Sequence, residues 1–190
     1  MTGLFGGAFD PPHNGHLALA RRARAHFGLD RLIVLPTGRA PHKRVETDPE
    51  TRFHLASLAF AGMPGLEVSR WEIDCDAPSY TVETVRHWPG SVFVVGADEF
   101  ADFLAWHEPD AILQHARLGV ATRPGYPRER LEPVLTGLAR AERVELFELE
   151  PNPVSSRELR ARAARGESLS GLVPPAVADE IEQRGLYRAT

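Results

Sequence analysis

The chain has 190 residues and only one cysteine, Cys75. A single thiol cannot close an internal disulfide bond, so the sequence excludes a disulfide framework and favours a reducing compartment. No apolar run approaches the roughly 20 residues that cross a bilayer. The N-terminus also lacks the charged and long apolar segments of a signal peptide. We therefore expect a soluble, cytoplasmic protein with no membrane partner.

Basic residues are not in surplus either. The 22 Lys and Arg against 26 Asp and Glu give a formal net charge of −4. A general nucleic-acid binder is expected to carry a basic excess, so we expect no nucleic-acid partner. A hydrophobic content of 43% with 25% charged residues is typical of an ordinary globular chain, and the length suits one domain with a full core.

Short apolar segments alternate with helical patterns along the chain. Asn14 and Asp48 are predicted N-caps, and Gly28 is a predicted helix stop. The segments predicted as strands are 2–5, 31–35, 66–68, 92–95, 118–121 and 144–149, and the helices between them are 14–27, 49–61, 81–87, 109–115 and 128–141. This alternation predicts an α/β fold: a Rossmann-like, doubly wound parallel sheet with helices on both faces.

The last forty residues have a different character. Residues 155–165 and 174–184 have helical patterns with no strand between them. We therefore expect one domain over 1–190, made of a Rossmann-like core at 1–150 and a small C-terminal helical appendage at 151–190.

The most informative segment, residues 4–16, has the sequence LFGGAFDPPHNGH. Gly6 and Gly7 lack a Cβ, so the backbone there can approach a ligand closely. His13 and His16 are three residues apart and share one face of a helix. The start of that helix offers unpaired N–H donors and the positive end of the helix dipole. Together these features predict a nucleotide-phosphate site beyond the end of the first strand.

This run also admits other interpretations. Neither the G-x-G-x-x-G fingerprint nor the P-loop pattern is present. Two imidazoles could ligate zinc, but a zinc site needs at least a third ligand, and the lone Cys75 offers no thiolate cluster. A turn with two solvated histidines is the remaining alternative.

Two motifs at opposite ends of the chain resemble the signatures of the nucleotidylyltransferase superfamily. The first is the Gly6–His16 run, and the second is Ser155-Ser156 followed by a basic helix. Further segments make the whole chain similar to the bacterial nicotinate-nucleotide adenylyltransferase family: Pro41-His42-Lys43, Ser79-Tyr80-Thr81, Gly96-Ala97-Asp98, Trp106-His107 and Arg123-Pro124-Gly125-Tyr126.

The resemblance implies transfer of the adenylyl group of ATP to nicotinate mononucleotide, a step of NAD biosynthesis that releases pyrophosphate. Such a reaction depends on positioning and charge stabilisation rather than on a protein nucleophile. The implied cofactor is Mg²⁺, carried mainly by ATP. Two alternatives remain: an adenylyltransferase for nicotinamide mononucleotide, phosphopantetheine or another small phosphate acceptor, and a catalytically silent nucleotide-binding protein.

The resemblance and the chemistry of the residues together predict three groups of site residues. The catalytic group is His13, His16, Lys43 and Arg157; the ATP-binding group is Gly6, Gly7, Ala8, Phe9, Gly96, Asp98, Ser155 and Ser156; the nicotinate mononucleotide-binding group is Thr81, Trp106 and His107, with Lys43 serving both substrates.

Two positions depart from the family pattern. Ala8 stands where Thr or Ser is usual, which removes one hydroxyl contact to phosphate. Arg157 stands third in a motif that commonly reads Ser-Ser-Thr, so its guanidinium either joins the phosphates or points to solvent.

Several assigned residues also have an ordinary structural interpretation. Asp98 is a ribose acceptor or the N-cap of the next helix, Trp106 a stacking face or a core residue, and the two serines are N-caps in either case. Lys43 is a phosphate ligand or a solubilising charge. Arg160, Arg162 and Arg165 are expected on a solvated face.

Overall fold

The sheet of the protein is fully parallel and doubly wound, as the sequence predicted. The computed structural model describes residues 1–40, 45–122 and 127–188. Its six strands lie in the order β3-β2-β1-β4-β5-β6. They are β1 Thr2–Gly7, β2 Arg31–Pro36, β3 Leu66–Val68, β4 Val92–Gly96, β5 Arg117–Thr122 and β6 Val144–Glu148. The order reverses between β1 and β4, so their carboxyl ends form the switch point where such sheets bind ligands.

The predicted helices are all present, with small shifts at some ends. They are α1 Asn14–Phe27, α2 Pro49–Phe60, α4 Thr81–His87, α6 Pro109–His115, α7 Arg128–Gly137, α8 Ser156–Ala164 and α9 Pro175–Arg184. The segment predicted as one helix over 128–141 ends at Gly137 and is followed by a separate 3₁₀ turn, η2, over Ala141–Arg143. Three further short elements were not predicted: α3 Trp71–Asp74, α5 Ala97–Phe100 and the 3₁₀ turn η1 Phe103–Ala105.

Capping residues fix the ends of α1 and α2. Asp48 caps α2 by accepting from the Thr51 N–H at 2.9 Å, and Gly28 ends α1 with a left-handed φ of 59°. The prediction that Asn14 caps α1 was wrong by one residue. His13 is the N-cap, with an extended φ of −147°, and Asn14 is the first helical residue. Its amide donates instead to the Gly171 carbonyl at 2.9 Å, which joins α1 to the C-terminal segment.

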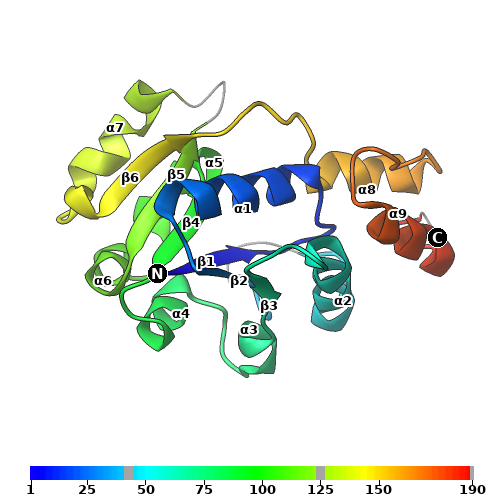
Figure 1. Cartoon of the computed structure of the whole chain (residues 1–190), viewed down its shortest axis with the longest axis horizontal. Coiled ribbons are helices and arrows are strands. Elements are labelled where there is room, and N and C mark those ends of the chain that lie inside the picture. Colours follow the sequence, from blue (N-terminus) through cyan, green and yellow to red (C-terminus); the bar gives the residue numbers. More distant parts are fainter. Residues whose placement is uncertain (41–44, 123–126, 189–190) are drawn as a thin grey trace.

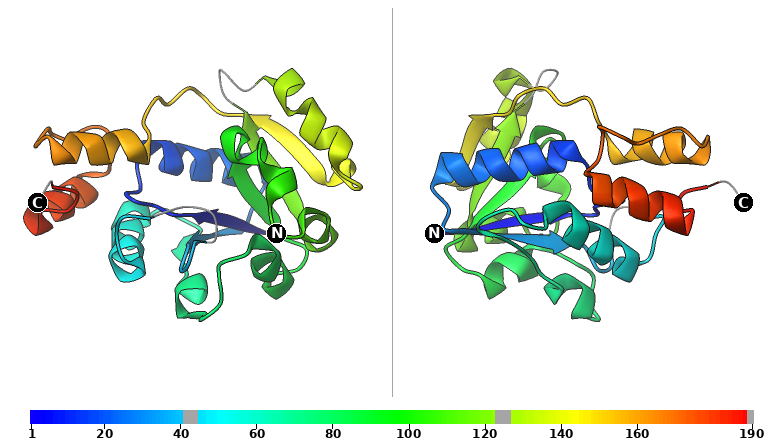
Figure 2. Two further views of the ribbon diagram at one scale, coloured as in Figure 1. Left: turned by 180° about the vertical axis from the view of Figure 1, so that it is seen from behind. Right: turned by 45° about the vertical axis from the view of Figure 1, so that its right-hand side comes forward.

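Helices cover both faces of the sheet, because successive strand residues point to opposite sides. Phe5 and Val34 pack in one cluster with α1 and α2, whereas Leu4 and Ile33 pack in the other with α4 to α7. Figure 1 shows α1 lying across the front of the sheet, and the right-hand view of Figure 2 separates α1 from the green helices on the opposite side.

The C-terminal helices α8 and α9 contribute to the same core as α1 and α2. Leu159, Val177 and Ile181 are buried in that cluster, with 0%, 0% and 4% exposure. Figure 1 shows α8 and α9 beside one another, beyond the carboxyl end of β1. No helix among residues 1–40, 45–122 and 127–188 is long and apolar enough to cross a membrane.

Candidate active site

The turn after β1 is shaped by a buried phenylalanine. Phe9 has a φ of 49°, a left-handed conformation, and its ring is 1% exposed. A Cβ at Gly7 would lie 3.1 Å from that ring, and a Cβ at Gly6 would lie 3.1 Å from the Phe93 ring. The two glycines were predicted to allow close approach of a ligand. The structure adds a packing reason for glycine at both positions. A side chain at Gly7 would press on the Phe9 ring, and one at Gly6 would press on the Phe93 ring of the neighbouring strand.

His13 and His16 stack on each other at the start of α1. Their ring centroids are 3.7 Å apart at an interplanar angle of 25°, so the sequence correctly placed them together. The His13 backbone N–H donates to His16 Nδ1 at 3.1 Å. A neutral His16 that accepts at Nδ1 carries its proton on Nε2. His16 thus has one hydrogen-bond donor left for a ligand.

The surroundings of His16 keep it neutral. The Phe9 and His16 rings pack edge to face, with their centroids 5.0 Å apart. Burial holds the pKa of His16 well below its usual value, and the neighbouring His13 lowers that pKa further. Near pH 7 His16 is therefore an uncharged N–H donor.

Asp10 is a buried carboxylate that the sequence analysis did not single out. It is 3% exposed and accepts from the Glu46 N–H at 2.9 Å, the Thr47 hydroxyl at 2.6 Å and the Tyr187 hydroxyl at 2.8 Å. These bonds tie the first motif to the segment before α2 and to the C-terminus. Asp10 lies within the motif run itself, but its partners are far away in sequence and gave no local signal.

Arg160 corrects an expectation. It was assigned to a solvated face, but its side chain is only 22% exposed. Its Nη1 donates to the Asp10 carbonyl at 2.8 Å, and its Nε lies 2.9 Å from Glu46. Arg160 faces inward because α8 packs against the turn that follows β1.

The second motif meets the first at the start of α8. Ser155 caps the helix by accepting from the Glu158 N–H at 3.2 Å. The Ser156 hydroxyl donates to the Pro11 carbonyl at 2.8 Å. The serine pair therefore stands at the predicted helix start, with both hydroxyls engaged by protein groups. Arg157 is exposed and makes no hydrogen bond or ion pair with any described residue.

Gly96 and Asp98 lie at the carboxyl end of β4, beside β1. Gly96 is the N-cap of α5 and Asp98 is the second residue of that helix, so the N-cap interpretation of Asp98 was wrong. The Asp98 carboxylate folds back over Gly96, with Oδ1 2.6 Å from where a Gly96 Cβ would stand.

The predicted acceptor residues come together on two short segments. Thr81 is the first residue of α4, and the ring of its neighbour Tyr80 lies 4.3 Å from His107. Trp106 is partly buried, with its ring 5.2 Å from Phe103. The packing of Trp106 on Phe103 supports its interpretation as a core residue, and its stacking role stays a prediction. Lys43 lies outside the described residues.

Comparison with known proteins identifies the family. Residues 4–162 match the cytidylyltransferase-like family. A probable nicotinate-nucleotide adenylyltransferase of Moorella thermoacetica is 41% identical over 199 residues, which cover 98% of this chain and 91% of the relative. One from Thermus thermophilus is also 41% identical, with 98% of each chain covered. The chain belongs to the nicotinate-nucleotide adenylyltransferase family.

Solved structures share the fold of this adenylyltransferase chain. Nicotinic acid mononucleotide adenylyltransferase of Plasmodium falciparum, complexed with NaAD, superposes with a TM-score of 0.78 at 16% identity. The match covers 98% of this chain and 96% of that one. At this identity the likeness concerns the fold, and it agrees with the doubly wound sheet predicted from the sequence.

The site offers magnesium little direct ligation by the protein. Within the described ranges, no group of three or more His, Cys, Asp or Glu is arranged to hold a metal ion. Asp10 is the buried carboxylate of the first motif, and both of its oxygens already accept protein hydrogen bonds. Magnesium prefers oxygen ligands over imidazole nitrogens, so the residues fit an ion held through ATP rather than in a protein cage.

A separate hollow lies away from these residues. It has a volume of about 590 Å³ and lies between the C-terminal half of α1 and the link from α2 to β3, with Arg21, Arg24, Leu29, Met63 and Leu66 among its lining residues. None of the assigned site residues lines it.

Proposed function

We propose that this adenylyltransferase moves the adenylyl group of ATP onto nicotinate mononucleotide. The products are pyrophosphate and nicotinate adenine dinucleotide, the deamido form of NAD. The observation that carries the proposal is the stacked His13–His16 pair, which is held at a helix start beside the switch point of the sheet. The names of relatives 36–41% identical to this chain support the same reaction.

In this reaction a phosphate oxygen of the mononucleotide attacks the α-phosphorus of ATP. The new P–O bond forms as the bond to the β-phosphate oxygen breaks, so the electron pair leaves with pyrophosphate. The protein supplies positioning and hydrogen-bond donors rather than a nucleophile. His16 Nε2–H and His13 donate to the phosphate oxygens on which charge develops.

The ATP subsite in this proposal surrounds the histidines. The backbone of Gly6, Gly7, Ala8 and Phe9 and the Gly96–Asp98 segment bind the nucleoside and phosphates. The backbone N–H groups of Ser155 and Ser156 at the start of α8, together with the Ser155 O–H, donate to the β- and γ-phosphates. Arg157 and Lys43 add positive charge there, and Mg²⁺ arrives bound to the triphosphate.

The acceptor subsite is formed by the start of α4 and the turn after η1. Thr81 and His107 satisfy the nicotinate carboxylate with hydrogen-bond donors, and Trp106 stacks on the cationic pyridine ring. The Tyr80–His107 contact supports this arrangement, because it joins the two segments that would hold the ring.

Pyrophosphate release tests the proposal directly. Purified protein is incubated with ATP, Mg²⁺ and one acceptor: nicotinate mononucleotide, nicotinamide mononucleotide or phosphopantetheine. We expect turnover to be fastest with nicotinate mononucleotide, with the dinucleotide confirmed by mass. Faster turnover with another acceptor would reassign the substrate, and no turnover with any of them would support a silent nucleotide-binding protein.

A further inference from the structure

Gly38 is held on three sides where the chain leaves β2. Its N–H donates to the Ser79 hydroxyl oxygen at 3.0 Å. Its carbonyl accepts from Arg52 Nη2 at 3.1 Å. A Cβ at this position would lie 2.1 Å from the Glu72 carbonyl oxygen, so only glycine fits against α3. We call these three contacts the Gly38 clamp.

Arg52 joins the clamp to the first motif. It lies on α2 and is 1% exposed. Besides Gly38, its guanidinium donates to the carbonyls of Ala8 at 3.0 Å and Thr47 at 3.2 Å. Among the described residues, no carboxylate lies within ion-pair distance of it. A buried guanidinium that donates to these three backbone carbonyls ties the turn after β1 to both ends of the connection from β2 to α2.

Ser79 joins the clamp to the acceptor segment. Its hydroxyl oxygen accepts from the N–H groups of both Gly38 and Arg39, and its own N–H donates to the Arg39 carbonyl at 2.9 Å. The hydroxyl also lies close enough to the Glu72 carboxyl to lower its pKa. Glu72 is 6% exposed and accepts from the Thr84 hydroxyl at 2.8 Å. Thr81 begins α4 only two residues after Ser79.

We infer that Arg52 and Ser79 are positioning residues, which set the phosphate-binding run against the acceptor-binding segment through the Gly38 clamp. Neither residue needs to touch a substrate. Arg52 reaches the first motif at Ala8, and Ser79 reaches the start of α4. The shared contact at Gly38 makes the two halves of the site one unit. The part concerning the acceptor rests on the proposed function.

Two variants test the clamp from opposite sides. Arg52→Lys keeps the charge, but an ammonium group cannot replace a planar fork that reaches three carbonyls. Ser79→Ala removes the acceptor for two backbone N–H groups at a half-buried position, so it keeps the test open even if Arg52→Lys folds poorly. The control is Leu55→Val, which disturbs the buried face of the same helix without touching the clamp.

Hydrogen exchange measures the clamp without any substrate. Ser79→Ala removes the hydrogen-bond acceptor of the Gly38 and Arg39 amides, so we expect both to exchange about threefold to tenfold faster. Arg52→Lys removes the bond to the Gly38 carbonyl, which loosens the same segment, so we expect faster exchange of these amides there as well. Amides of α1 should keep wild-type rates, and Leu55→Val should leave residues 38 and 39 unchanged. Wild-type exchange at these two amides in both variants would overturn the clamp, whatever happens to the melting temperature.

The acceptor preference measures the positioning role. The ratio of kcat/KM for nicotinate over nicotinamide mononucleotide does not depend on how much enzyme is folded. We expect this ratio to fall at least about threefold in Arg52→Lys and Ser79→Ala, and the double variant to fall less than the product of the two. An unchanged ratio together with faster exchange would reduce the clamp to a purely structural role. If the wild-type protein turned over neither mononucleotide, the proposed function would fail. The hydrogen-exchange rates of Gly38 and Arg39 would still test the clamp.

Discussion

His16 shows how one residue's surroundings decide its chemistry. Its Nδ1 is occupied by the His13 N–H, and burial lowers its pKa. We expect His16→Ala to keep its fold and to lose on the order of 10²–10³ in kcat, the usual cost of removing one preorganised donor. Steady-state kinetics and thermal unfolding measured on the same sample check this. His26→Ala, at the far end of α1, is the matched control.

The same arrangement gives a pH expectation. A histidine with a lowered pKa stays neutral as pH falls from 8 to its usual titration range, so His16 contributes no loss of kcat between about pH 8 and pH 6.5. Near-wild-type kcat in His16→Ala would remove the residue from the catalytic group.

Trp106 is partly buried against the core, and in the proposed function its ring also stacks on the acceptor. We expect Trp106→Ala to raise KM for both mononucleotides through lost stacking, with KM for ATP nearly unchanged. Trp106→Phe, which keeps an aromatic face, should recover most of the loss. For the wild type we expect nicotinate to be preferred at least about a hundredfold, because nicotinamide leaves desolvated donors unpaired. A rise in KM for ATP alone would place Trp106 elsewhere in the site.

At the scale of single residues, the sequence predicted side-chain contacts best where the two partners are close in the chain. The His13–His16 pair follows from a three-residue interval on a helix. The partners of Asp10 and the inward position of Arg160 could not be predicted, because these contacts join residues 36 to 177 positions apart. Arg52 gave no signal in the sequence, because two of its carbonyl partners, Ala8 and Gly38, lie 44 and 14 positions away.

Whole elements were predicted well where hydrophobic periodicity extends over several turns. The α3, α5 and η1 segments are three or four residues long, so no period can be recognised in them. The failure at 128–141 has a specific cause. The helix stops at Gly137 and Leu138 is extended with a ψ of 135°, but Leu138 is buried and continues the apolar spacing of α7 past the end of the helix.

At the start of α8, neighbouring residues are expected to differ in role: Ser156 in stability and Arg157 in ATP binding. Ser156→Ala removes the hydroxyl that bonds Pro11, so we expect the free energy of unfolding to fall by about 1 kcal/mol. Arg157→Ala changes an exposed side chain, so stability should move by less than about 0.5 kcal/mol. Its KM for ATP should rise, or its kcat fall, if the guanidinium meets the triphosphate. Urea unfolding and ATP kinetics on both variants check this, and unchanged kinetics would mean that Arg157 faces solvent.

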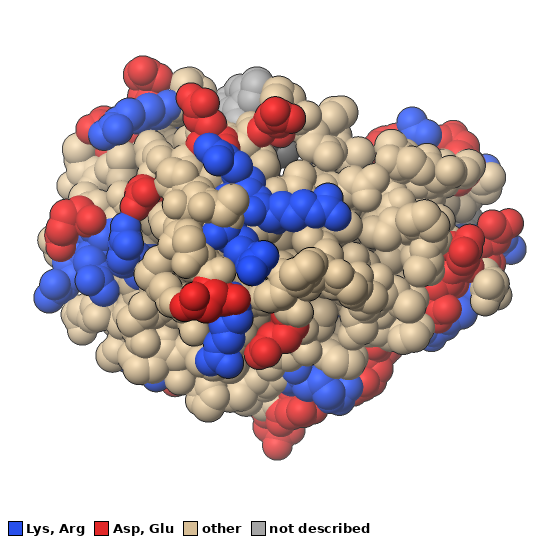
Figure 3. Space-filling view, viewed as in Figure 1, with Lys and Arg blue, Asp and Glu red and all other residues tan. Residues whose placement is uncertain are grey.

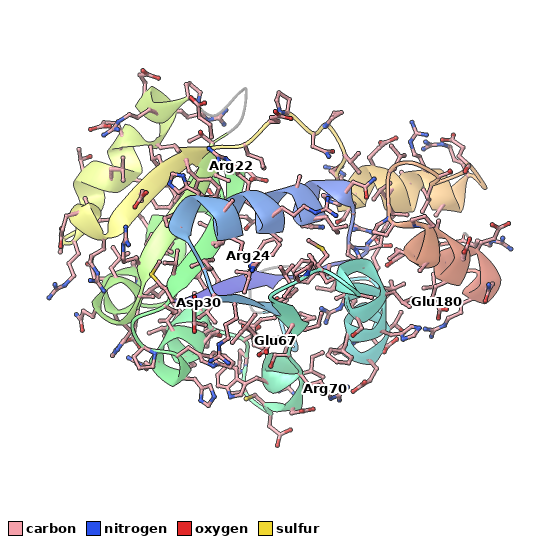
Figure 4. All side chains as sticks on the ribbon, in the orientation of Figure 1. Arg22, Arg24, Asp30, Glu67, Arg70 and Glu180 are labelled. Carbon is pink, nitrogen blue, oxygen red and sulfur yellow. The ribbon has the colours of Figure 1, made fainter. Side chains whose placement is uncertain are left out.

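At the scale of the molecule, the C-terminal helical segment is joined to the rest of the fold by specific side-chain contacts. Tyr187 bonds Asp10, and on α9 Glu180 lies 3.1 Å from His54 of α2 (Figure 4). On the face in Figure 3, basic and acidic side chains are interspersed, with several basic side chains near its centre.

The stability of the whole chain should depend on pH through Glu72. Burial raises the pKa of Glu72 to about 7, although hydroxyls and Arg52 partly oppose the shift. An acid whose pKa is higher when folded than when unfolded stabilises the fold fully below its unfolded pKa, near 4.5. That contribution is lost as pH rises toward 7, because the unfolded chain then holds fewer protons than the folded one.

Glu72→Gln keeps the size of the side chain and cannot ionise, so it should escape this loss. We expect the free energy of unfolding of the variant, relative to wild type, to rise between pH 5 and pH 8 by at most about 3 kcal/mol, at 1.36 kcal/mol per pKa unit. Urea unfolding at pH 5, 6, 7 and 8 measures it. Glu67→Gln, an exposed position on β3 (Figure 4), is the control. Parallel pH curves for wild type and Glu72→Gln would show that the buried carboxyl does not titrate in this range.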